Sequence, residues 1–188
     1  MNLSIKINRV HLTFRTSFAQ YHVRRHHNMP APPRHVLIVG GGLAGPCLAL
    51  ALARQNIRST IFEIRSSRSI AGGSISLAPN ALYILDRYAG VYEDIKAHGH
   101  TYRRIAAYAE DGEKFGEIAV SEEEKGEEAY PAVRIMRSDI HNVLMDAGER
   151  MQDKLITVRY GARLSKIEES AHGVTATFED GSTAEGKS

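Results

Sequence analysis

Apolar residues occur along the chain in short runs, and their spacing separates strands from helices. The continuous, β-branched run Val36–Val39 predicts a central parallel strand that is buried on both faces. The apolar stretch Cys47–Ala53 has the length of a core helix and falls far short of the roughly 18 residues that a membrane span needs. A second strand is predicted at Ser59–Phe62. Strand, helix and strand in this order indicate a βαβ unit, and hence an α/β fold.

Two more helices are predicted farther along the chain. Pro79 fits the first turn of a helix that runs to about Tyr88, because that turn has no internal N–H bond to lose. Ser138 is predicted to cap the other helix at its N-terminus. The apolar face of that helix consists of Ile140, Val143, Leu144 and Ala147.

The last part of the chain has strand patterns. Leu155–Val158 predicts another parallel strand. Ala162–Glu168 and Gly173–Phe178 alternate between apolar and polar residues, and Glu179–Ser182 reads as a turn. These segments predict antiparallel strands after the α/β unit.

Three glycines follow the first predicted strand in the pattern GxGxxG. Gly40 allows a tight turn, Gly42 lets a pyrophosphate approach the backbone, and Gly45 lets the helix pack closely on the strand. The free N–H groups at the helix N-terminus attract an anion. We therefore predict that the backbone of this turn, with Leu43 and Ala44, binds the pyrophosphate of a dinucleotide.

An acidic residue ends the second predicted strand at the distance that this motif requires. Glu63 lies 18 positions beyond Gly45, where a carboxylate accepts hydrogen bonds from an adenosine ribose. Its negative charge would repel a 2′-phosphate, which favours FAD or NAD over NADP at this site. Asn56 stands after the helix between the strands, where a left-handed residue is expected. Spacing alone does not separate FAD from NAD.

Charge and cysteine content narrow the class of protein. All 22 acidic residues lie at or after Glu63, whereas eight of the 24 basic residues precede it. The folded part is therefore mildly acidic, and nucleic-acid binding, which needs clustered Lys and Arg, is not expected. The single cysteine, Cys47, excludes an intrachain disulfide, suggests a reducing, cytoplasmic compartment, and is expected to pack as an apolar side chain. The acidic run at residues 121–128 is interpreted as a solvated loop, and no metal site is predicted.

Residues 1–34 form a basic leader whose role stays open. Their composition is similar to that of a mitochondrial presequence, but the apolar residues from Leu3 to Phe14 step mostly by two, unlike an amphipathic helix. The leader is therefore an artefact or disordered tail, with Met29 as the true start, or a mitochondrial targeting segment, or a structural element. Its histidines are interpreted as part of a solvated tail rather than a metal site: His22, His26 and His27.

Two segments resemble the aromatic-ring hydroxylases, which are the single-component FAD monooxygenases related to para-hydroxybenzoate and salicylate hydroxylases. Ser69–Leu82 resembles the loop and helix start after the second strand of that family, and its loop contains Gly72 and Gly73. Val133–Leu144 resembles the family's strand–Arg–helix segment, in which an arginine is followed by apolar residues at three and seven. Arg137, Ile140 and Leu144 match this pattern, whereas Arg134 departs from it.

The resemblance covers about residues 35–186 and implies a Rossmann-like FAD-binding domain. That domain has three layers, with a parallel sheet and an antiparallel β-meander. The resemblance also implies that the cofactor is FAD and that Gly73 and Arg137 contact it. It further implies that NAD(P)H reduces the FAD for the hydroxylation or epoxidation of a small organic substrate. The family's later strand, turn and substrate domain have no counterpart here. Residues 35–188 are therefore expected to be the N-terminal part of the FAD-binding domain, and to be inactive alone because the substrate domain is missing.

Two other hypotheses remain. A nicotinamide-dependent dehydrogenase would use the same glycine turn and Glu63 for NAD. A truncated fragment would bind FAD without catalysis. No catalytic side chain can be named from the sequence, because no Ser/His/Asp arrangement or carboxylate pair stands out.

Overall fold

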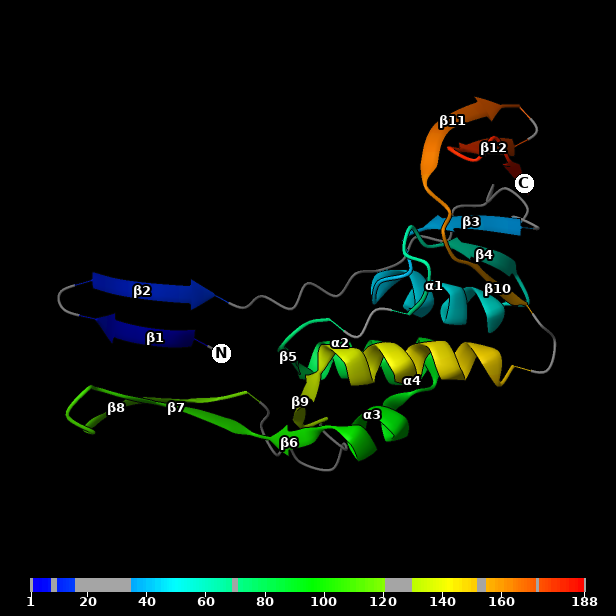
Figure 1. Cartoon of the computed structure of the whole chain (residues 1–188). Helices are drawn as coiled ribbons and strands as arrows, with labels where there is room; N and C mark the ends of the chain where they lie inside the picture. The colour runs from blue at the N-terminus through cyan, green and yellow to red at the C-terminus, as the bar shows by residue number, and fades with distance from the viewer. Residues whose placement is uncertain are drawn as a thin grey trace, which may run out of the picture. The chain divides into compact units, whose positions relative to one another are not determined.

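The computed structural model describes residues 2–7, 10–15, 35–68, 71–120, 130–151, 155–171 and 173–187. The chain divides into two compact units, Met1–Ala31 and Pro32–Ser188 (Figure 1). In the first unit, β1 (Asn2–Ile7) and β2 (Val10–Arg15) form an antiparallel hairpin. The period-two spacing of the apolar leader residues therefore belongs to strands. The leader histidines, the proline-rich segment before residue 35 and the acidic run lie outside the described residues.

The second unit contains a six-stranded mixed sheet in the order β10-β4-β3-β13-β12-β11. The parallel strands are β3 (His35–Val39), β4 (Arg58–Phe62) and β10 (Ile156–Arg159). The antiparallel strands are β11 (Leu164–Ser170), β12 (Gly173–Phe178) and β13 (Thr183–Lys187). The predicted parallel strands and the β-meander are thus confirmed, and β13 joins them by pairing with β3 at His35. The three-layer Rossmann arrangement stays a prediction.

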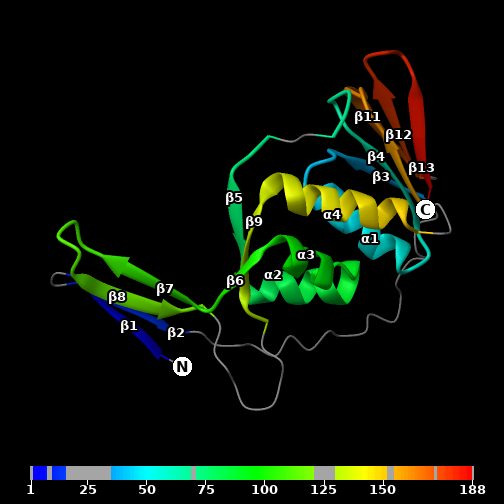
Figure 2. The same cartoon turned by 60° about the horizontal axis from the view of Figure 1, so that its bottom comes forward.

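The side chains of β3 and β4 alternate between two apolar clusters, as the pleat of a strand requires. On one face, Ile38 and Ile61 pack with Ala49 of α1 (Ala44–Ala53). On the other face, Phe62 packs against Phe178 of the meander, with ring centroids 4.5 Å apart. The helix α1 also contacts α4 (Arg137–Glu149), so it lies between the parallel strands and that helix (Figures 1 and 2).

The expectation that Val36–Val39 is buried on both faces is fully met only at Ile38, since Val36 and Leu37 are half-buried and Val39 is exposed. Ile38 is only 7% exposed, whereas Val39 is 54% exposed. Val39 ends the strand directly before the glycine turn, and on the side away from β4 the described pairing of β3 is limited to His35. The end of this strand is therefore open where the glycine turn begins.

A second group of elements builds the largest core cluster. A three-stranded antiparallel sheet consists of β5 (Ser74–Leu77), β9 (Ala132–Met136) and β6 (His100–Tyr102). Around it lie α2 (Pro79–Ile84), the π-helical turn η1 (Leu85–Ala89), α3 (Tyr92–His98) and α4. The predicted apolar residues of α4 join this cluster, as do Leu82 and Leu85. Pro79 occupies the first turn as predicted, and Tyr88 at the far end is 50% exposed.

The predicted capping role of Ser138 is wrong. The N-cap of α4 is Met136, without a side-chain hydrogen bond, and Arg137 is the first helical residue. The Ser138 hydroxyl instead donates a hydrogen bond to the carboxylate of Asp139. The strand β9 therefore runs directly into the helix.

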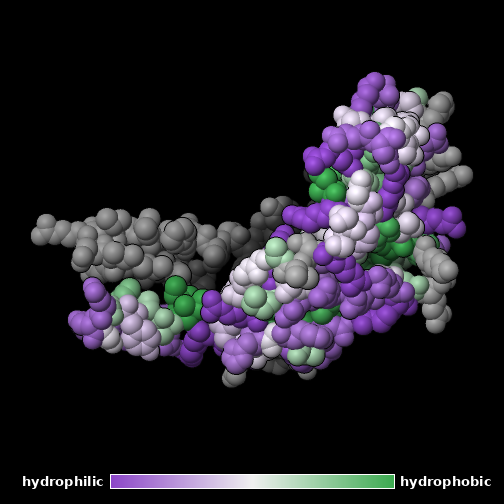
Figure 3. Space-filling model, viewed as in Figure 1, coloured by the Kyte–Doolittle hydropathy of each residue, from purple (hydrophilic) through white to green (hydrophobic). Residues whose placement is uncertain are grey.

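A hairpin of β7 (Arg104–Tyr108) and β8 (Lys114–Ala119) completes the described part of the second unit. Its large apolar side chains stay exposed, among them Phe115 at 72%. Green, apolar atoms accordingly lie among purple ones on its surface (Figure 3). Among the described residues, no helix is long and apolar enough to span a bilayer.

Candidate dinucleotide-binding site

The three glycines of the predicted motif occupy three different environments. Gly40 has a φ of +107°, which only glycine adopts readily, and its N–H donates to the Phe62 carbonyl. A Cβ added at Gly45 would lie 2.1 Å from the Gly40 carbonyl oxygen, so the helix packs on the turn without room for a side chain. A Cβ added at Gly42 would have only the Arg137 Nη2 within 4 Å, at 3.9 Å. These are the roles that the sequence predicts: turn, close packing and open approach.

The helix that follows the turn has no side chain that caps or neutralises its N-terminus. Leu43 is the N-cap of α1 and offers no side-chain cap, and the first turn contains no acidic residue. The partial positive charge of these N–H groups is therefore not neutralised by the helix itself. At the other end, Asn56 has a φ of 58°, and the N–H groups of Asn56 and Ile57 donate to Ala53 and Leu52. This is the left-handed C-terminal cap that the sequence predicts.

Glu63 is buried beside the turn, where it is 6% exposed. Its Oε2 accepts a hydrogen bond from the Gly41 N–H at 2.8 Å, and its Oε1 accepts one from the Arg65 N–H at 2.9 Å. Burial alone would raise the pKa of this carboxyl, but these two N–H groups and the Arg65 guanidinium outweigh it and hold the pKa below its ordinary value. The group is therefore ionised at neutral pH, and one lone pair of Oε2 is left to accept a further hydrogen bond.

Arg137 stands at the junction of β9 and α4, as predicted. Its backbone N–H donates to the Gly73 carbonyl at 3.0 Å, and its Nη1 lies 3.5 Å from the Ala71 carbonyl oxygen. Its side chain packs against Gly72, where an added Cβ would approach the Arg137 Cδ to 2.9 Å. Gly73 has open space around its Cα. Among the described residues, no carboxylate forms an ion pair with the Arg137 guanidinium.

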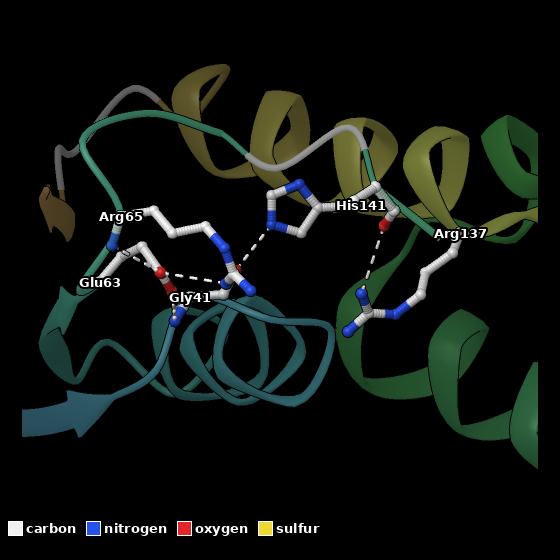
Figure 4. Close-up of polar contacts among 6 residues, drawn as sticks. Gly41, Glu63, Arg65, Arg137 and His141 are labelled. Atoms are coloured by element: carbon white, nitrogen blue, oxygen red, sulfur yellow. Dashed lines mark hydrogen bonds and ion pairs between the residues drawn. The ribbon is translucent and has the colours of Figure 1, made fainter. Parts of the chain in front are cut away.

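A pocket brings most of these groups together (Figure 4). It is lined by Gly41, Gly42, Leu43, Glu63, Arg65, Ser67, Arg68, Ala71, Arg137, His141 and Tyr160. Arg65 pairs with Glu63, and Arg68 pairs with two carboxylates of α4. The guanidinium of Arg137 is thus the lining cation without a described acidic partner. Four of the predicted site residues do not line the pocket: Gly40, Ala44, Gly45 and Gly73.

Sequence reasoning missed His141. This residue of α4 is 6% exposed, and its Nε2 lies 2.6 Å from the carbonyl oxygen of Gly41. His141 follows Arg137 by four residues, so both side chains lie on one face of the helix. That spacing was the available signal, but the contact itself joins residues 100 positions apart.

Cys47 lies in the first turns of α1 and packs against the largest core cluster. Burial raises the pKa of its thiol to about 11. We expect the folded protein to react slowly with a thiol reagent at pH 8, because little thiolate is present. Unfolding in denaturant should accelerate the reaction, since the unfolded thiol ionises at lower pH. A reaction as fast in the folded as in the unfolded protein would contradict the packing role of Cys47.

The arrangement fits the pyrophosphate of a dinucleotide cofactor. Three features that favour an anion meet at one pocket. They are a turn of glycines, a helix N-terminus without an acidic side chain, and an arginine without an acidic partner among the described residues. The fold and site thus define a dinucleotide-binding protein.

Comparison with known proteins identifies the family. Residues 34–188 match the FAD binding domain family, and the chain belongs to this family. The FAD-dependent monooxygenase pynG of Aspergillus niger is 34% identical over 149 residues, which are 78% of this chain and 33% of that protein. The 3-amino-4-hydroxybenzoate 2-monooxygenase PtmB3 of Streptomyces platensis is 32% identical over 154 residues, covering 80% and 37% of the two chains.

Solved structures share the fold. HpxO of Klebsiella pneumoniae, in complex with FAD and uric acid, matches with a TM-score of 0.65 and 23% identity, over 81% of this chain and 37% of that chain. The p-nitrophenol 4-monooxygenase PnpA of Pseudomonas putida matches with a TM-score of 0.67 and 19% identity, over 80% and 38%. The chain thus spans about a third of the length of the relatives that it matches. Membership of the family supports FAD, the cofactor that the resemblance implies.

Proposed function

We propose that the chain is the FAD-binding part of an FAD-dependent monooxygenase that acts on a small organic molecule. The observation that carries the proposal is the open Gly42 at a helix N-terminus without an acidic residue in its first turn. The nearest neighbour of Gly42 is the guanidinium of Arg137, which has no acidic partner among the described residues. The family membership and the monooxygenase names of the relatives support it.

Different groups at the pocket would bind different parts of the cofactor. The backbone N–H groups from Gly42 to Ala44 would hold the pyrophosphate, because they point from the start of α1 and lack a side-chain cap. Arg137 would add charge-assisted hydrogen bonds to a phosphate oxygen. The free lone pair on Glu63 Oε2 would accept a hydrogen bond from a ribose hydroxyl. We further propose the Rossmann-like, three-layer arrangement that brings such groups to one sheet edge.

When bound, FAD would supply the redox chemistry, which is the use of electrons from NAD(P)H and of molecular oxygen to oxidise the substrate. The residues described here bind and orient the cofactor. We assign no catalytic residue.

Titration of the purified chain with FAD tests the proposal, and a pair of arginine variants sharpens it. We expect Arg137→Gln to weaken FAD affinity by roughly tenfold, because a charge-assisted bond to phosphate is lost. Arg134→Gln is the matched control, since Arg134 lies exposed on β9, three residues away. It should leave the affinity unchanged. Flavin fluorescence quenching measures both.

A parallel titration with NAD distinguishes an FAD-binding protein from a nicotinamide-dependent dehydrogenase. A chain that binds NAD more tightly than FAD would be a nicotinamide-dependent protein, and the proposal would fail. Equal losses in the two arginine variants would show that Arg137 contributes only general positive charge.

A further inference from the structure

His141 contacts the glycine turn from the side of α4. Its Nε2 lies 2.6 Å from the Gly41 carbonyl oxygen, and the ring is almost completely buried (Figure 4). A carbonyl oxygen only accepts hydrogen bonds, so Nε2 must carry the hydrogen and donate it. The tautomer of the imidazole is therefore defined by this contact.

The second ring nitrogen, Nδ1, makes no interaction that would explain a histidine at this position. The Nδ1 of His141 is buried, and it has no hydrogen-bond partner among the described residues. Leaving a buried polar atom unsatisfied costs free energy, which an apolar side chain of similar size would avoid. The Nε2 contact with Gly41 is therefore the interaction that an imidazole provides here. His141 lines the pocket, but Nδ1 is inaccessible to solvent and Nε2 is engaged by Gly41, so the ring offers no free polar atom to a molecule there.

Gly41 is held at both of its backbone polar groups. Glu63, at the end of β4, accepts from its N–H, and His141, on α4, donates to its carbonyl. Because the peptide that joins Gly41 to Gly42 is planar, fixing the carbonyl also fixes the direction of the Gly42 N–H. Two elements far apart in sequence thus set the orientation of the amides at the start of α1.

We infer that His141 is a positioning residue for the dinucleotide: it holds the Gly41 peptide so that the amides of the turn are preorganised for the pyrophosphate. This inference rests on the proposed function, since it concerns FAD affinity. His141 acts through Gly41, since neither of its ring nitrogens is free to bond the cofactor. Preorganisation raises affinity because the turn loses no further freedom when the ligand binds.

A pair of isosteric variants of the full chain tests the inference. The amide nitrogen of glutamine lies near the position of Nε2, whereas that of asparagine lies near the position of Nδ1. We expect His141→Gln to retain FAD affinity within about threefold, and His141→Asn to lose about tenfold. His141→Leu should lose as much as His141→Asn. The unfolding temperature of each variant is measured by circular dichroism. FAD affinity is then measured by fluorescence quenching at a temperature well below it.

The outcomes separate this inference from the proposed function. If the unmodified chain does not bind FAD, both fail. If the unmodified chain binds FAD and the Asn and Gln variants bind it equally well, the positioning role of His141 is wrong while the proposed function stands. A loss of thermal stability in the Asn and Leu variants without a loss of affinity would likewise reduce His141 to a packing residue. Should the Leu variant fail to fold, the comparison of Gln with Asn still decides.

Discussion

Replacing Gly42 with valine should leave the chain folded and weaken its affinity for FAD by roughly ten- to a hundredfold. In the protein without a ligand, a Cβ at this position meets only the flexible end of Arg137, at 3.9 Å. The same Cβ would occupy the space through which the pyrophosphate approaches the backbone. The loss should therefore appear in the dissociation constant and not in the unfolding temperature, and both can be measured on one preparation.

The matched control is Gly116→Val, because Gly116 lies on β8 with open space around its Cα. It should change neither quantity appreciably. If Gly42→Val bound FAD as tightly as the unmodified chain, the pyrophosphate would not lie on this turn, and the site would have to be sought elsewhere.

Replacing Gly45 with alanine should destabilise the fold itself. The added Cβ would lie 2.1 Å from the Gly40 carbonyl oxygen, a backbone atom that cannot rotate away as a side chain can. We expect α1 to be displaced from β3, at a cost of about 3 kcal/mol in the free energy of unfolding. For a domain of this size the unfolding temperature should fall by roughly 5–10 °C. Thermal unfolding followed by circular dichroism measures the change.

Gly148→Ala provides the comparison within a helix. An added Cβ there would lie 3.5 Å from the Ile156 Cδ1, an ordinary contact, and alanine favours a helix more than glycine. This variant should be as stable as the unmodified chain or more so. A Gly45→Ala protein with an unchanged unfolding temperature would mean that α1 does not pack on the turn as described.

The sequence predicts the local geometry of the site well. The strands that flank α1, the different roles of the three glycines and the left-handed Asn56 all depend on steric rules that act within a few residues. Arg137 was also placed correctly, between a strand and a helix, because a family resemblance supplied its context. The resemblance to FAD monooxygenases likewise agrees with the family that the comparison identifies.

Contacts between distant segments could not be predicted in the same way. The bond from His141 to Gly41 joins two elements whose packing the sequence does not reveal. The sequence did not indicate that Glu63 accepts hydrogen bonds from the N–H groups of Gly41 and Arg65, while its contact with a ribose stays a prediction. The cap expected from Ser138 failed because β9 leads straight into α4. In each case tertiary structure decided between partners that were equally possible locally.

The end of β3 has a consequence for the surface around the glycine turn. β3 lies inside the sheet, between β4 and β13, and its last residue, Val39, is nevertheless 54% exposed. A polar side chain at this position should therefore disturb the apolar core little, whereas it would change the polarity of the surface directly beside the turn.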